Sequence, residues 1–321
     1  MSAAYLIAQL PAGLAPARLE GLPDVRRAFS GTRVLRAAGG AEAWWLERFG
    51  VARQADWPVA PLRLAEPGTR YWMCADPVHL RVDGDAVLLD AHVAATLDAT
   101  RSLRLVEKLA AHFASEDVVL RATSPREWVL GFVAPQEATT HSPCAAHRRS
   151  IEPFLPTGHA AGRLKRLATE AQMLLFEAED AAPHGEINAL WLWGGGLAID
   201  AVAAHPEYRV WSDATYLRQL ALLSHAQHDT PQIEALTDVL RSGVRLTHFI
   251  EAGLGPDDPD AWSGWLNSHW LNPLGAAARA SATELHLVLT NAHRHASAPL
   301  FRFDTLAWLR RSRLATIFDE S

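Results

Sequence analysis

The stretch from residue 162 to residue 196 constrains the fold more than any other part of the sequence. The segment GRLKRLATEAQMLLFEAED (162–180) places its apolar residues at steps of three and four, which predicts an amphipathic helix with one apolar stripe. The segment INALWLW (187–193) is an uninterrupted apolar run, which is typical of a strand covered on both faces. We therefore expect a helix and then a central strand, with three glycines emerging at the carboxyl end of that strand.

Strand-like and helix-like segments alternate through most of the remaining chain, and this alternation indicates the fold class. Strands are expected at 3–9, 70–91 (interrupted by Pro77 and folded into a hairpin at 83–85), 117–123, 127–133, 208–213, 245–251 and 284–291. Helices are expected at 42–50, 95–114, 214–225, 231–241 and within 260–281. The pattern predicts an α/β fold with a mixed, mostly parallel central sheet and helices on both faces.

A long segment without periodicity suggests how the chain is organised. Residues 134–160 are rich in Pro, Ser, Thr and His and show neither helical nor strand spacing. We interpret the chain as one globular unit over 1–321. Within it, an N-terminal half (1–133) is joined by the connection 134–160 to a C-terminal α/β half (161–321).

Composition and charge exclude several classes of protein. Hydrophobic residues make up 49% of the chain, which is enough for a substantial core. The net charge of −6 argues against non-specific nucleic-acid binding, which requires a basic face. No run of 18 apolar residues is present, so no membrane span is expected. The first residues lack a basic leader pattern and the two cysteines, Cys74 and Cys144, lie far apart, so we expect a protein of the reducing cytoplasm.

The glycines Gly194, Gly195 and Gly196 allow two interpretations. Glycines at the carboxyl end of a strand let the backbone approach a ligand closely, but they also allow a purely structural turn. GGGLAID matches neither G-x-G-x-x-G nor G-x-x-x-x-G-K-[ST], so we expect no nucleotide cofactor. Glu170 and Gln172 lie beside the apolar stripe of the preceding helix. They could face a ligand at the glycines or belong to the solvated surface.

Metal ligands and nucleophiles give weaker signals. Asp76 and His79 would lie on opposite faces of a strand unless Pro77 bends it. His293 and His295 could share one face of an extended segment, although NAHRHAS has the composition of a loop. The signatures G-x-S-x-G, H-E-x-x-H and C-x-x-C are absent from the sequence. We therefore expect no bound metal and assign no catalytic residue.

Three segments resemble one family of proteins. PVHLRVDGDAVLLD (77–90), LPTGHAAGRLKRLATEAQMLLF (155–176) and INALWLWGGG (187–196) resemble blocks in RpfE-like regulatory proteins of proteobacteria, which are also labelled cofactor-independent phosphoglycerate mutase-like proteins. The resemblance covers roughly residues 70–200 and includes Trp191. The ligand-binding residues that we predict on these blocks are His79, Glu170, Gln172, Asn188, Trp193, Gly194, Gly195 and Gly196.

The resemblance implies a cytoplasmic regulatory or small-ligand-binding protein that takes a small polar or anionic molecule. The mutase label implies a distant kinship to the alkaline-phosphatase fold. Metal-dependent mutases open with an Asp-Gly motif directly after the first strand, whereas this chain continues into PAGLAPARLEG and has no aspartate before Asp24. We therefore expect no mutase activity. The alternatives are a metal-dependent phosphoryl-transfer enzyme and a partner protein that docks through a tryptophan-rich surface.

Overall fold

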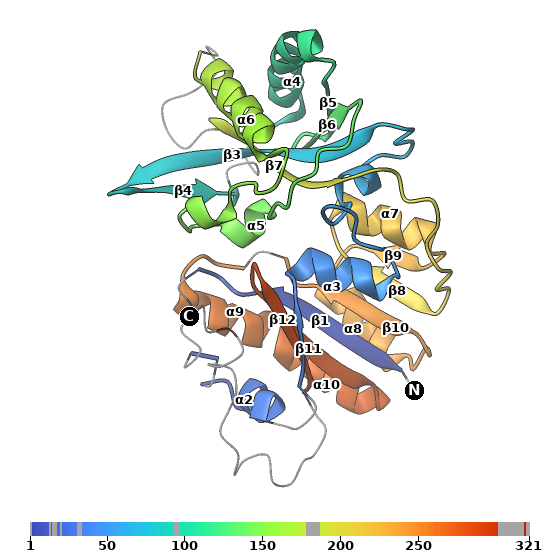
Figure 1. Ribbon diagram of the computed structural model, residues 1–321. Coiled ribbons are helices and arrows are strands. Elements are labelled where there is room, and N and C mark those ends of the chain that lie inside the picture. The colour runs from blue at the N-terminus through green and yellow to red at the C-terminus, as the bar shows by residue number, and fades with distance from the viewer. Residues whose placement is uncertain are drawn as a thin grey trace. The chain divides into compact units, whose positions relative to one another are not determined.

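The computed structural model describes residues 2–12, 14, 18–19, 21–30, 34–92, 97–177, 187–253, 255–300 and 318. The chain forms two compact units, and the second is inserted into the first (Figure 1). The first unit comprises Met1–Phe49 and Val202–Ser321, and the second comprises Gly50–Ala201. This division differs from the expected halves, because residues 1–133 contribute to both units.

The first unit is built on a seven-stranded sheet with the order β2-β12-β11-β1-β10-β8-β9. Its strands are β1 (Ala3–Gln9), β2 (Leu35–Ala38), β8 (Tyr208–Trp211), β9 (Gln227–Asp229), β10 (Thr247–Glu251), β11 (Glu284–Thr290) and β12 (Arg294–Pro299). All pairs from β11 to β9 are parallel, and β12 pairs antiparallel with both β11 and β2. The expected fold class, a mixed and mostly parallel α/β sheet with helices on both faces, is confirmed.

The alternation of side chains along β1 separates the two faces of this sheet. Leu6 is fully buried in a core cluster with the helices α8 (Ile233–Arg241) and α10 (Asn272–Ser281). The opposite face carries Tyr5, whose ring centroid lies 6.0 Å from that of Trp44 on α3 (Ala41–Arg48). Helix α3 therefore covers one face of the sheet, and α8 and α10 cover the other (Figure 1).

The described part of the first unit contains further helices besides α3 and α8. They are α2 (Pro23–Ser30), α7 (Thr215–Leu223), α9 (Pro259–Trp265), the π-helix η5 (Leu266–Leu271) and α10, with α9, η5 and α10 continuous in the chain. The expected helix within 260–281 is thus confirmed, but its middle is wound as a π-helix. Among the described residues, no helix of either unit is both long and apolar enough to cross a membrane.

The second unit is built on an antiparallel sheet around the long strand β3 (Tyr71–Asp83). β3 pairs with β4 (Ala86–Asp90), β6 (Glu127–Phe132) and β7 (Ala189–Gly196), and β6 pairs with β5 (Val119–Ser124). The expectation that 187–193 forms a central strand is wrong, because within the described residues β7 pairs with β3 alone. All eight residues of β7 are nevertheless buried, and this burial explains the uninterrupted apolar run.

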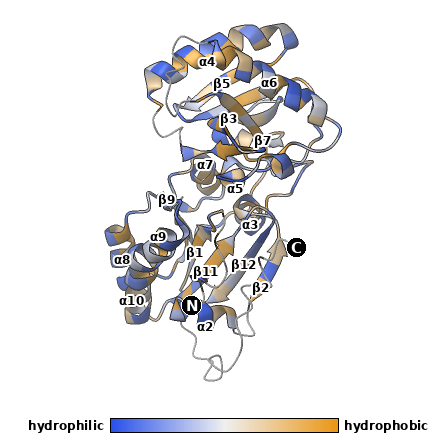
Figure 2. Cartoon of the chain, turned by 90° about the vertical axis from the view of Figure 1, so that its left-hand side faces the viewer, coloured by the Kyte–Doolittle hydropathy of each residue, from blue (hydrophilic) through white to orange (hydrophobic). Residues whose placement is uncertain are grey.

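Two amphipathic helices cover one face of this sheet. Helices α4 (Ala99–Phe113) and α6 (Ala161–Phe176) bury Leu109 and Leu167 against β3, β6 and β7. Figure 2 shows hydrophilic and hydrophobic bands alternating along α4, as expected for a helix with one buried side. The Asp98 side chain caps α4 by accepting a hydrogen bond from the backbone N–H of Arg101 over 2.9 Å. The expected extension of α6 to residue 180 lies outside the described residues.

Most other expected elements are confirmed, with two corrections. Pro77 does not interrupt β3, because it keeps its place in the ladder opposite Leu190. The segment NAHRHAS, expected as a loop, instead leads into β12, where His295 is the partner of Thr290 in the antiparallel ladder with β11. The segment 134–160 contains only the short helices α5 (Pro143–Ala146) and η4 (Glu152–Phe154), with η1 (Ala60–Arg63) and η3 (Ala114–Glu116) elsewhere in this unit.

Candidate functional site

The three glycines at the end of β7 allow close packing by side chains of the same unit. A Cβ atom on Gly194 would lie 2.9 Å from the Cβ atom of Val59, and Gly194 has a φ of +62°. A Cβ atom on Gly195 would overlap the Tyr71 hydroxyl, and one on Gly196 would overlap Pro58. Side chains of the same unit therefore fill the space beside the three glycines. This packing agrees with the interpretation of the glycines as a structural turn.

A buried ion pair lies on the face of the second sheet opposite to α4 and α6. The Arg63 guanidinium donates to both carboxylate oxygens of Asp76, with Nη1–Oδ1 and Nη2–Oδ2 distances of 2.5 and 3.0 Å. The Trp193 indole Nε1 donates to Asp76 Oδ2 over 2.7 Å, and the guanidinium carbon lies 5.2 Å from the Trp193 ring centroid. Glu127 Oε1 lies 3.6 Å from Arg63 Nε. Trp193, predicted to bind a ligand, thus stabilises the buried Asp76 carboxylate by donating a hydrogen bond to it.

Two further hydrogen bonds link Gly194 to Asp56 through Thr140. The Gly194 N–H donates to Thr140 Oγ1 over 2.9 Å, and the Thr140 hydroxyl donates to Asp56 Oδ2. Burial raises the pKa of Asp56 above its usual value, and the hydrogen bond from Thr140 partly offsets this effect. Burial and the Asp56 charge together raise the pKa of the nearby Tyr71 hydroxyl. These contacts fix the glycine end of β7 to the segment before η1.

Asn188 acts as a main-chain mimic just before β7. Its Oδ1 accepts from the Leu80 N–H over 2.7 Å, and its Nδ2 donates to the Leu80 carbonyl oxygen over 2.8 Å. The side chain thereby extends the pairing of β3 with β7 by one further position. His79, whose backbone pairs with Asp90 of β4, lies next to Leu80 on β3.

Glu170 and Gln172 lie beside the buried residues of α6 and not among them. The Glu170 carboxylate accepts from Arg166 over 2.6 Å and lies 3.4 Å from His112 Nε2 of α4, while Arg166 also pairs with Glu116. Gln172 is exposed. Glu170 thus faces α4, whereas the three glycines contact residues before and at the start of β3. The shared ligand site that the sequence predicts on these residues stays a prediction.

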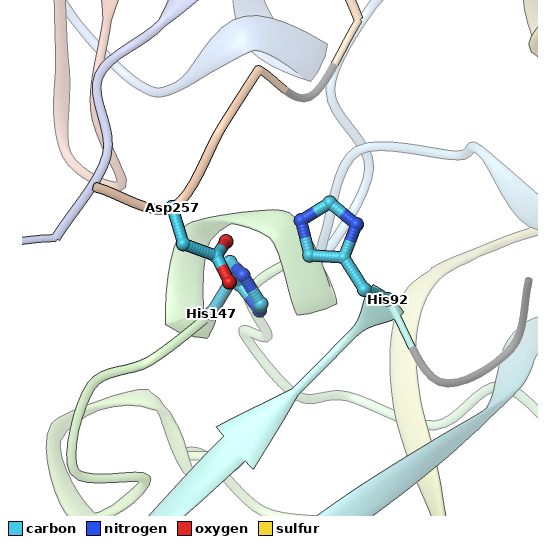
Figure 3. Close-up of side chains that lie close together, drawn as sticks. All are labelled: His92, His147 and Asp257. Carbon is cyan, nitrogen blue, oxygen red and sulfur yellow. The ribbon is translucent and has the colours of Figure 1, made fainter. Parts of the chain in front are cut away.

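The second unit also contains a pair of histidines that the sequence analysis did not single out. The rings of His92 and His147 have centroids 4.5 Å apart (Figure 3). His147 Nδ1 accepts from the Ala91 N–H over 3.1 Å, so the neutral ring carries its proton on Nε2. In this geometry neither nitrogen of His147 offers a lone pair to a metal ion. Asp257, also drawn in Figure 3, belongs to the first unit.

The first unit has a topological switch point between β8 and β10. The chain leaves β8 through α7 toward β9 at the edge of the sheet, whereas it leaves β10 through α9, η5 and α10 toward β11 on the far side of β1. The two adjacent parallel strands therefore send their connections in opposite directions. Open α/β sheets bind ligands outside the carboxyl ends of the strands at such a point.

Two polar side chains meet at this switch point. Ser212 follows β8 directly and Glu251 is the last residue of β10. The Ser212 hydroxyl donates to Glu251 Oε2, and Ser212 Oγ accepts from the Ala214 N–H over 2.9 Å. Ser212 is fully buried, and Glu251 is partly exposed. A partly exposed carboxylate with a fixed orientation can accept hydrogen bonds from a polar ligand.

Histidines on the neighbouring strands stay neutral near neutral pH. His228 Nε2 lies 3.0 Å from the Ser212 carbonyl oxygen, so Nε2 carries the proton, and burial lowers the pKa of this ring. His248 is completely buried on β10 and accepts from the Trp211 indole over 3.3 Å. Burial, with a smaller effect of the Arg209 charge, lowers the pKa of His248 to about 4. Neither ring therefore adds a positive charge to these strands near neutral pH.

Sequence reasoning did not select Ser212 or Glu251, although a signal for them exists. Each is a polar residue at the end of a short apolar strand, in YRVWS and THFIE respectively. Carboxyl-terminal residues of parallel strands share one edge of the sheet, so such positions are candidates whenever the strands are expected to be parallel. Their neighbourhood depends on strand order, which the sequence pattern does not supply.

Comparisons with known proteins give a likeness of fold only. No protein-family model matches the chain, and no curated protein matches it. The chain is similar to the structure of PH0037 protein from Pyrococcus horikoshii, with 12% identity and a TM-score of 0.51 over 98% of this chain and 92% of that one. It also aligns with a cofactor-independent phosphoglycerate mutase from Thermoplasma acidophilum DSM 1728, with 10% identity and a TM-score of 0.40 over 93% and 89% of the two chains.

Proposed function

We propose that this protein binds a small polar molecule at the carboxyl edge of the first unit's sheet and does not catalyse phosphoryl transfer. The hydrogen bond between Ser212 and Glu251 at the switch point of β8 and β10 carries this proposal, because it holds a carboxylate where α/β sheets bind their ligands. The regulatory role and the cytoplasmic location expected from the sequence resemblance belong to the same proposal.

The end of β1 supports the part of the proposal that concerns catalysis. β1 lies in the middle of the sheet, and the residue after it, Leu10, is buried in the apolar core and bonded through its N–H to Thr290 O over 2.9 Å. In the part of the chain that the structure describes, neither unit by itself brings three His, Cys, Asp or Glu side chains together. A two-metal phosphoryl-transfer site needs several such side chains around each ion. The described residues of either unit do not fit this requirement, so we derive no step through a metal ion.

A thermal-shift screen tests the binding part. The full chain is heated with amino acids, sugars, polyols and three-carbon acids with and without phosphate. A ligand at 100 times its Kd stabilises a protein by about 2.7 kcal/mol, which is a rise in Tm of several degrees. We expect such a rise for the wild type and its loss in Glu251→Gln. The control Asp238→Asn, which alters an exposed pair on α8, should retain the rise.

Two outcomes would contradict the proposal. A ligand whose effect persists unchanged in Glu251→Gln would bind elsewhere. Phosphoglycerate mutase or phosphatase turnover with manganese, accompanied by one or two metal ions per chain in elemental analysis and lost on chelation, would establish the alternative enzyme.

A further inference from the structure

Helix α3 begins at the same carboxyl edge and runs back over the sheet (Figure 1). Its start is fixed to the turn after β11, because the Gly39 N–H donates to His293 O over 2.7 Å. Its last residue, Arg48, lies with its guanidinium carbon 4.9 Å from the Tyr5 ring centroid in the middle of β1. The amino end of α3, the end with free N–H groups and positive potential, therefore lies at the edge where the parallel strands finish.

The first turn of α3 is preceded by two glycines and has no side-chain cap. The N-cap residue is Gly40, which has no side chain that could accept a hydrogen bond from the first turn. A Cβ atom on Gly40 would come within 2.9 Å of Asn291 O, so only glycine allows the helix to start this close to the end of β11. Gly39 and Gly40 are partly exposed, which leaves the turn open to solvent.

Thr290 provides a second and independent observation. It is the last residue of β11, it is completely buried, and its hydroxyl has no hydrogen-bond partner among the described residues. An unsatisfied buried hydroxyl costs roughly 1–3 kcal/mol. It is therefore a position where a ligand atom would be stabilising.

The direction of the Thr290 side chain follows from its neighbours. His286, four residues earlier on β11, stacks on Tyr5 and so faces α3, and strand alternation puts Thr290 on the same face. Its partner in the antiparallel ladder, His295, has Nδ1 3.0 Å from Gly39 O. The Thr290 hydroxyl thus points toward the amino end of α3.

We propose that the amino end of α3 and the Thr290 hydroxyl bind one oxyanion, the phosphate or carboxylate group of a small molecule. Backbone N–H groups of the first turn donate to its oxygens and Thr290 Oγ1 supplies a further donor. The inference rests on the proposed function, since it assigns a chemical group to a ligand at the same sheet edge. It involves different residues from Ser212 and Glu251.

The charges near this position determine the affinity. The turn from β11 to β12 contributes His293 and Arg294, whereas Glu42 in the first turn of α3 has Oε2 3.4 Å from the position of a Cβ atom on Gly40. The Glu42 carboxylate therefore lies beside the proposed anion and repels it. Removing this charge should tighten binding, because like charges a few ångströms apart near a surface interact by about 1 kcal/mol or more.

The experiment measures binding of inorganic phosphate and of acetate to the full chain by calorimetry at constant ionic strength. We expect Glu42→Gln to bind phosphate or acetate roughly tenfold more tightly than the wild type. Thr290→Val, tested on its own and with Glu42→Gln, should weaken binding at least about tenfold, since a hydrogen bond to a charged group contributes about 1.5–3 kcal/mol. The ratio of phosphate to acetate affinity identifies the kind of oxyanion.

Thr237→Val is the matched control. Thr237 is a buried threonine of α8 in the same unit, and its hydroxyl donates to Glu234 O, away from this edge. It should leave anion binding unchanged. Urea unfolding checks that Thr290→Val folds, and removal of an unpaired hydroxyl should keep or raise its stability.

Two results would overturn the inference. One is the absence of phosphate and acetate binding in Glu42→Gln, and the other is binding that Thr290→Val leaves unchanged. The thermal-shift screen can also yield a ligand whose binding depends on Glu251 but not on Thr290. That result would contradict the oxyanion site alone and would support the proposed function.

Discussion

The Trp193 indole donates to Asp76 Oδ2 over 2.7 Å, on the carboxylate that also neutralises Arg63. Both residues of the pair are buried. Arg63 is the last residue of η1, and Asp76 lies on β3. A tryptophan that the sequence suggested for a ligand thus adds a hydrogen bond to an internal ion pair, and the first prediction concerns the energy of that pair.

Asp76→Ala should destabilise the protein by about 3–5 kcal/mol, because it removes two hydrogen bonds from the buried Arg63 guanidinium and leaves its charge beside Glu127 alone. Urea unfolding of the purified variant measures the loss. Asp83→Ala is the matched control on the same strand, since the Arg81–Asp83 pair is exposed and should contribute no more than about 1 kcal/mol. Equal effects of the two substitutions would show that the buried pair has no special role.

Gly195→Ala should cost about 1–3 kcal/mol, because its methyl group overlaps the Tyr71 hydroxyl. Combination with Tyr71→Phe should recover part of the loss, since the phenylalanine ring lacks the atom of closest approach. Gly162→Ala on α6 meets nothing within 4 Å and should be neutral or stabilising by up to about 1 kcal/mol. Thermal unfolding compares the variants, and a Gly195→Ala protein as stable as the wild type would contradict the packing role.

Asn188→Ala should destabilise the protein by about 1–3 kcal/mol, because it removes both hydrogen bonds to the Leu80 backbone. Gln172→Ala removes an exposed side chain and should change stability by less than about 0.5 kcal/mol. Both residues were expected at one ligand site. If Gln172→Ala abolishes binding of a ligand that stabilises the wild type, the ligand site that the sequence predicts on α6 and β7 is correct.

Stability should fall as the pH is lowered from about 6.5 toward 4. The pKa of His248 is about 4 in the folded protein and near 6.5 in the unfolded chain, so the unfolded state takes up the proton first. The stabilisation is complete above the unfolded pKa and is lost through this window, by about 3 kcal/mol in total. His228 and His286, whose pKa values burial also lowers, act in the same direction.

His248→Gln isolates the contribution of one ring. Its free energy of unfolding, measured by urea titration at pH 7 and pH 5, should depend on pH less than that of the wild type. A variant with an unchanged pH dependence would place the acid sensitivity in other groups.

Local spacing in the sequence was sufficient for most elements. The periodicities that indicated 3–9, 162–180 and 284–291 correspond to β1, α6 and β11, because each records which side of an element is buried. Burial also explains the error at β7. A strand that pairs on one side only but is covered on both faces has the same uninterrupted apolar run as a central parallel strand.

Only the tertiary structure decided which segments become neighbours. β1 pairs with β10 and β11 across an insertion of more than a hundred residues, and this pairing places Thr290 beside the end of β1 and the start of α3. Strand order likewise brings Ser212 to Glu251 and the glycines of β7 to Val59, Tyr71 and Pro58. Side-chain spacing records the burial of a face but not the identity of the segment that covers it, so the elements could be read from the sequence and the sites could not.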